Sequence, residues 1–152
     1  MFNEKLISQI KDKKAYKTEI VRNYTEFLSK YPEIFSDLSN GSNFDFAIYD
    51  SNKSYKNDSP IEVFNVYRNG QGIEIKPGSA EDSDLQLSLS KYAVEKLIRT
   101  KTKDEYSKLL GNFYNHPNVE KEWIDFTLLK RTQIVIEKGY GKFAKSAGLI
   151  EG

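Results

Sequence analysis

The sequence predicts an α+β fold in which helices cover one face of a five-stranded, largely antiparallel sheet. Two observations predict it. Apolar residues recur at helical spacing in the first forty residues and again beyond residue 90, whereas between residues 43 and 89 they alternate with their neighbours. A length of 152 residues fits one compact core. We therefore expect one domain over 1–152, with N-terminal helices in 1–40 and the sheet with its helices in 43–149.

The first third of the chain is predicted to be helical. Its apolar residues start at Leu6 and are spaced most regularly from Thr18 to Lys30. Pro32 cannot lie inside a helix but suits a first helical turn. We therefore expect Pro32–Leu38 to form a short separate helix that ends before Asn40-Gly41.

Four strands follow from the alternation. Asn43–Tyr49 and Ile61–Tyr67 are the first two. Asn69-Gly70 tolerates the positive φ angles of a tight hairpin, so Gly72–Lys76 is expected to return antiparallel. Asp84–Leu89 alternates again and leads into a helix over Lys91–Arg99, with Ser90 as its cap.

The last third is predicted to hold helices and one more strand. Thr102 and Glu105 form a capping box that opens a helix. Another helix is expected from Pro117 to Leu129. Thr132–Glu137 could continue that helix, but its consecutive β-branched residues favour a fifth strand. Gly141–Leu149 is predicted to be a final short helix.

Composition excludes several classes of site. The chain has no Cys, which rules out disulfides, iron–sulfur clusters, thiolate metal sites and cysteine nucleophiles, and its single His, His116, rules out multi-histidine sites. With 23 Lys and Arg against 22 Asp and Glu, no overall charge favours nucleic acid. Without an apolar run for a membrane span or signal peptide, we expect a soluble, cytoplasmic protein.

Three segments, in this order, resemble the sterol carrier protein type-two family. They are the hairpin Tyr67–Ile73, the acidic residue and alternating strand of Asp84–Ser90, and the closing segment Thr132–Leu149 with its glycine turn. The resemblance covers about Asn43–Leu149. The chain departs from the family pattern in the loop 51–60, in the stretch 111–131, and at its end, which lacks a peroxisomal Ser-Lys-Leu signal.

The resemblance implies a lipid carrier. Family members hold fatty acids, acyl-CoA or other lipids in an apolar tunnel between sheet and helices, and this task requires no catalytic residue, cofactor or metal. Each methylene removed from water contributes about 0.8 kcal/mol. On this mapping the expected tunnel wall consists of Phe46, Ile48, Val63, Leu87, Leu109, Leu110, Phe113, Trp123, Phe126, Ile134 and Ile136.

Trp123 and Phe126, expected one helical turn apart, are the foremost wall candidates, although every wall residue could equally belong to an ordinary core. The segment 130–145 carries five basic residues and one acidic one. Of the basic residues, Lys138, Lys142 and Lys145 are predicted to contact a lipid headgroup or a membrane surface, although a solvated face explains them as well. No nucleic-acid partner is expected, and the oligomeric state is left open.

Two other functions remain open from sequence. A non-lipid binding or regulatory module would have the same fold with a filled core. An enzyme would need carboxylates with perturbed pKa values, such as Asp45 or Glu74, facing a pocket. Strand alternation places Asp45 opposite Phe44 and Phe46, where we expect solvent.

Overall fold

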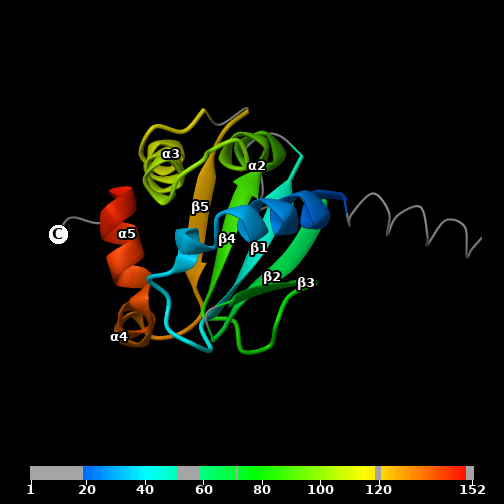
Figure 1. Cartoon of the computed structure of the whole chain (residues 1–152). Coiled ribbons are helices and arrows are strands. Elements are labelled where there is room, and N and C mark those ends of the chain that lie inside the picture. Colours follow the sequence, from blue (N-terminus) through cyan, green and yellow to red (C-terminus); the bar gives the residue numbers. More distant parts are fainter. Residues whose placement is uncertain (1–18, 51–58, 71, 119–120, 150–152) are drawn as a thin grey trace, which may run out of the picture.

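The computed structural model describes residues 19–50, 59–70, 72–118 and 121–149, and shows a five-stranded sheet with helices against it (Figure 1). The strands are β1 (Asn43–Tyr49), β2 (Glu62–Asn69), β3 (Gly72–Pro77), β4 (Leu85–Ser90) and β5 (Ile124–Leu128). Their order in the sheet is β3-β2-β1-β4-β5. β1 and β4 are parallel, and the other neighbouring pairs are antiparallel. The predicted α+β fold with a largely antiparallel sheet is confirmed, and the parallel pairing of β1 with β4 makes the sheet mixed.

The helical elements of the described chain lie before β1 and after β4. Residues 19–30 are helical, and the remaining helical elements are η1 (Pro32–Phe35), α2 (Lys91–Leu97), α3 (Lys103–Asn115), α4 (Thr132–Val135), η2 (Ile136–Tyr140) and α5 (Gly141–Ala147). The short helix at Pro32, the helix after β4 and the last helix were all expected from sequence.

Local capping signals set two helix starts. The Ser90 hydroxyl accepts a hydrogen bond from the Ala93 N–H at 3.2 Å, and the Thr102 hydroxyl accepts one from the Glu105 N–H at 3.0 Å. The Glu105 carboxylate in turn accepts the N–H of Lys101 at 2.9 Å, one residue before the cap. Both predicted caps are confirmed. They could be predicted from sequence because a cap depends on neighbouring residues alone.

The prediction was wrong around the fifth strand. The expected helix from Pro117 to Leu129 does not form in the described residues of that stretch. Asn118 and Glu122 instead form an isolated β-bridge, and β5 follows and pairs antiparallel with β4. The expected strand Thr132–Glu137 is helical, as α4 and the start of η2. Because β5 already occupies the open edge of β4, the β-branched segment after it folds back as helix, against its local preference.

Some predictions fall outside the described residues. These are the helical pattern from Leu6 up to residue 18 and nearly all of the loop 51–60. Within the described ranges, no helix combines the length and apolar character needed to cross a membrane.

The two faces of β1 differ in what they contact. Phe44, Phe46 and Ile48 point into the main core beneath the helices. Asp45 lies on the opposite face, as expected, but it is buried rather than in solvent. Its carboxylate accepts hydrogen bonds from the Asn65 side chain at 2.9 Å and the Ala80 N–H at 3.1 Å. A buried carboxylate that is satisfied in this way is a structural group.

Candidate functional site

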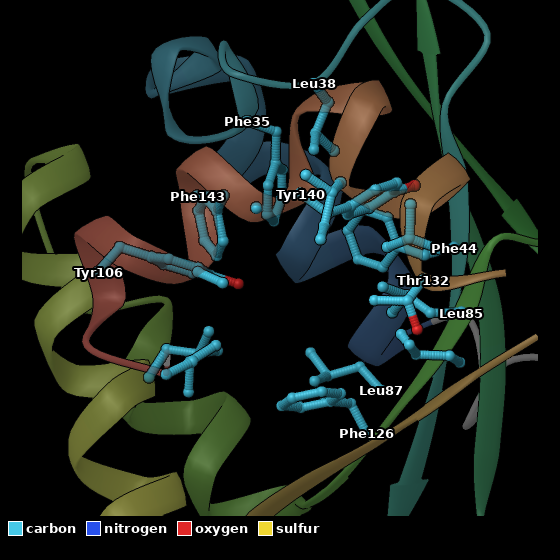
Figure 2. Close-up of a pocket in the computed structure, with 17 residues that line it drawn as sticks. Phe35, Leu38, Phe44, Leu85, Leu87, Tyr106, Phe126, Thr132, Tyr140 and Phe143 are labelled. Carbon is cyan, nitrogen blue, oxygen red and sulfur yellow. The ribbon is translucent and has the colours of Figure 1, made fainter. Parts of the chain in front are cut away.

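An apolar cavity of about 170 Å³ lies within the main core (Figure 2). It is bounded by β1, β4 and β5 of the sheet and by η1, α3, α4, η2 and α5. Side chains from these elements point toward a common central space. The lining residues are Phe35, Leu38, Phe44, Leu85, Leu87, Tyr106, Leu110, Phe126, Leu128, Thr132, Val135, Ile136, Tyr140, Gly141, Phe143, Ala144 and Leu149.

The cavity walls carry almost no available polar group. Tyr106 bonds through its hydroxyl to the hydroxyl of Tyr24, and the Tyr140 hydroxyl donates to the Asp84 carboxylate at 2.8 Å. Burial raises the pKa of both wall tyrosines, and the Asp84 charge raises that of Tyr140 further, so both stay neutral. The walls therefore offer contacts to hydrocarbon and no charge to a bound group.

The cavity opens between β5 and the α4–η2 segment. Its inner walls are buried, with Tyr106 0% and Leu110 3% exposed, whereas Leu128 is 38% and Ile136 52% exposed. β5 is an edge strand, so no further strand covers this side within the described sheet. An apolar group can therefore reach the cavity from this edge.

Asp84 anchors the wall that carries this mouth. Its side chain is fully buried, and one carboxylate oxygen accepts Lys130 Nζ and Lys138 Nζ, each at 2.7 Å. The other oxygen accepts the Tyr140 hydroxyl and, at 2.9 Å, the Asn43 N–H. Burial alone would raise the pKa of Asp84, but these hydrogen bonds outweigh it and the pKa is lowered. One carboxylate thus ties the segment after β5 to the start of β1.

Two glycines bring the same wall into direct backbone contact with the rest of the fold. A Cβ on Gly111 of α3 would lie 1.6 Å from the carbonyl oxygen of Ala147 in α5. Gly139 adopts φ +100°, and a Cβ there would lie 1.9 Å from the Asp37 carbonyl oxygen. Any larger residue at either position would push the α4–η2–α5 wall outward.

The structure brings four of the eleven predicted wall residues to the cavity, namely Leu87, Leu110, Phe126 and Ile136. The other seven lie elsewhere. Phe46, Ile48 and Phe113 are buried in the packed part of the main core, Leu109 packs beside it, and Ile134 is 40% exposed.

Trp123 and Val63 are placed away from the cavity. Trp123 is fully buried in a separate cluster with Ala47, Tyr49 and Val63. Ala47 and Tyr49 alternate with the core-facing residues of β1, so this cluster lies on the other face of the sheet. Because residues 124–128 form a strand, Trp123 and Phe126 are not one helical turn apart, and that prediction was wrong.

The three predicted headgroup lysines differ in their surroundings. Lys138 is ion-paired with Asp84 and its side chain is 28% exposed. Lys142 is well exposed and lies 3.5 Å from Asp37, and Lys145 is exposed on α5. Their contact with lipid stays a prediction. Among the described residues, no cluster of His, Cys, Asp and Glu could hold a metal ion.

Sequence reasoning missed the contribution of the last helix and of the sheet end nearest Asp84. Phe143, Ala144 and Leu149 were left out, although their apolar spacing in the expected helix Gly141–Leu149 was visible. Phe44 and Leu85 share strand faces with the predicted Phe46 and Leu87, so alternation alone could have added them.

Comparison with known proteins gives little further information about the function of this cavity. No protein-family model matches the chain, and no curated protein matches it. A solved structure titled "UbiJ-SCP2 Ubiquinone synthesis protein" aligns over 100% of this chain and 99% of its own, with 13% sequence identity and a TM-score of 0.41. At this TM-score the likeness carries no weight for function, so the proposals below depend on the cavity itself.

Proposed function

We propose that this protein binds an apolar ligand, such as the acyl chain of a fatty acid or another lipid, non-covalently in the cavity between β4, β5, α3 and α5. The cavity itself carries the proposal. Protein cores normally pack without voids of this size, and the apolar side chains around this cavity lack contacts on the side that faces it. A hydrocarbon group inside it would recover the lost contacts.

The volume limits what the cavity takes. At about 170 Å³ it is close to an engineered protein cavity that accepts benzene, and it is smaller than most ligand pockets, which measure roughly 300–1,000 Å³. A long chain therefore places one end inside and leaves the rest at the mouth, or it displaces the α4–η2 wall. Transfer of the ligand between membranes is a further part of the proposal.

The runner-up function has less support. A regulatory module of the same fold requires a filled core, whereas this core has a cavity that is open on one side. Nothing in the arrangement of Asp45 favours an enzyme, because its carboxylate is occupied by Asn65 and Ala80 away from the cavity.

A pair of variants on α5 tests the proposal. Ala144→Leu adds a side chain to a residue that lines the cavity, and Ser146→Leu makes a similar change at an exposed position two residues away. Each protein is titrated with a fluorescent fatty acid. We expect the wild type and Ser146→Leu to bind the probe alike and Ala144→Leu to bind it about tenfold more weakly. Equal binding by all three proteins, or none by the wild type, would refute the proposal.

A further inference from the structure

The large apolar side chains that are most exposed among the described residues all lie in residues 128–136, the segment beside the cavity mouth. They are Leu128 (38% exposed), Leu129 (52%), Ile134 (40%) and Ile136 (52%). We call these four residues the apolar rim. Leu128 and Ile136 also line the cavity, so the rim is continuous with its interior.

The rim results from how residues 128–136 fold. β5 is the edge strand of the sheet and ends at Leu128. α4 follows with only four residues, and of these Val135 is buried in the core. Ile134 and Ile136 flank Val135 and are both exposed, and Ile136 also lines the cavity. Isolated exposed apolar residues are common, but four within nine positions, two of which line the cavity, are an unusual concentration of exposed apolar surface.

The segment 130–145, which includes Ile134 and Ile136 of the rim, is basic. Arg131 lies between Leu129 and Ile134 in sequence, and Lys145 lies on α5. Both are exposed, and no ion pair between described residues includes either one. Lys130 and Lys138 share one buried carboxylate, that of Asp84, with Asp82 also near Lys130. Glu137 is the one acidic residue in the segment 130–145.

The chemistry of the rim fits a membrane better than a protein. Protein interfaces bury roughly 800 Å² per partner and are enriched in aromatic residues and Met, whereas this rim is four aliphatic side chains over nine residues. Aliphatic side chains flanked by Lys and Arg are the pattern of segments that insert shallowly into a bilayer and meet anionic headgroups.

We propose that the apolar rim docks onto the surface of an anionic phospholipid bilayer and turns the cavity mouth toward it. Leu129 and Ile134 enter the bilayer boundary, while Arg131 and Lys145 face the headgroups. An apolar chain can then move between bilayer and cavity without crossing water. The purpose of this surface follows from the proposed function, but the contact itself can be tested separately.

The test uses flotation with vesicles of phosphatidylcholine, with or without phosphatidylserine. Leu129→Gln/Ile134→Gln removes two rim residues that do not line the cavity, so binding of the fluorescent fatty acid in solution should stay unchanged. We expect the wild type to float with phosphatidylserine vesicles. The partition coefficient of the double variant should be at least about tenfold lower. Arg131→Gln should weaken binding to the anionic vesicles alone.

Ala144→Leu is the matched control, because it fills the cavity and leaves the rim intact. If it floats like the wild type yet binds the probe weakly, docking and ligand binding are separate properties. Rim-dependent flotation of a protein that takes up no probe would support docking and refute the proposed function. Docking is overturned if the wild type does not float, if the double variant floats equally well, or if the rim instead mediates dimer formation in solution.

Discussion

The two halves of the main core differ in how they are filled. In the packed half, the helix of residues 19–30 lays Tyr24 across β1 and β2, with ring centroids 5.1 Å from Phe46 and 5.4 Å from Phe64, while Phe46 and Phe64 stack at 5.0 Å. In the hollow half, between β4, β5, α3 and α5, the side chains surround a cavity instead. Both halves share one sheet, so the difference arises in the helical layer.

The difference shows that fixed anchors, and not only side-chain size, decide whether a core closes. The wall of the hollow half is held by the Asp84 carboxylate and by backbone contacts at Gly111 and Gly139. Moving that wall inward would break hydrogen bonds to a buried charge, and this cost opposes closure of the cavity.

The largest effect is expected from breaking the main anchor. Asp84→Asn removes a fully buried charge with which Lys130 and Lys138 are both paired. Losing one partner of a buried ion pair costs about 3–5 kcal/mol, and we expect about 3 kcal/mol because both lysines are partly exposed. Urea unfolding at neutral pH measures it. A loss of less than 1 kcal/mol would mean that Asp84 does not anchor the wall.

The same variant should change the acid limb of the stability curve. The pKa of Asp84 is lowered in the folded state, so its contribution is present above the unfolded pKa and is lost as pH falls through the folded pKa, below about pH 4. Unfolding free energies of wild type and variant, measured from pH 7 downward, should therefore converge in acid. A constant difference across that range would contradict the assignment.

Gly111→Ala should open the hollow half at its second anchor. The added methyl would meet the Ala147 carbonyl oxygen at 1.6 Å, so α5 has to move away from α3. We expect a loss of about 2 kcal/mol in unfolding free energy, measured by urea denaturation, together with altered fatty-acid binding. Gly72→Ala is the control, because a Cβ there meets its nearest neighbour at an ordinary 3.6 Å. Equal stability of both variants would argue against a close α3–α5 contact.

The smallest change in stability is expected from substitutions that add a larger side chain to the core. These substitutions distinguish the packed half from the hollow half most clearly. Ala93 in α2 is fully buried and lies outside the cavity, whereas Ala144 lines it. Ala93→Leu should lose about 1–2 kcal/mol through overpacking, while Ala144→Leu should be neutral or stabilising because it occupies empty space. Thermal unfolding of the two variants provides the comparison. Similar losses in both would show that the hollow half is as full as the other.

The sequence predicted most of the fold because most of its signals are local. The hairpin turn at Asn69-Gly70, the cap at Ser90 and the box at Thr102 and Glu105 each involve neighbouring residues. The prediction of the fifth strand was wrong because the position of this strand depends on pairing with β4, which is distant in sequence. Ile124, Phe126 and Leu128 alternate as a strand should, but Pro117 favoured a helix, and the β-branched residues after them were the stronger local strand signal.

The candidate site was harder to predict from the sequence than the fold was. Strand alternation turned Leu87 toward the core, and helical spacing did the same for Leu110, and both line the cavity. Trp123 was assigned to the wrong element and so to the wrong face. The Asp84 anchor joins residues 46 and 54 positions apart along the chain, and no local pattern links them. A cavity is a property of three-dimensional packing, so a pattern of apolar residues predicts a core but not the space left within it.

Methyl chemical-shift mapping during titration with a fatty acid tests the central claim most directly, because it reports on both halves of the core at once. The cavity predicts shifts at the lining methyl groups of Leu87, Leu110, Val135 and Leu149. It predicts none at Ile48, Val66 and Leu97, which are buried in the packed half. Shifts confined to the packed half, shifts spread evenly over both halves, or no shifts at all would contradict the claim that this cavity is the binding site.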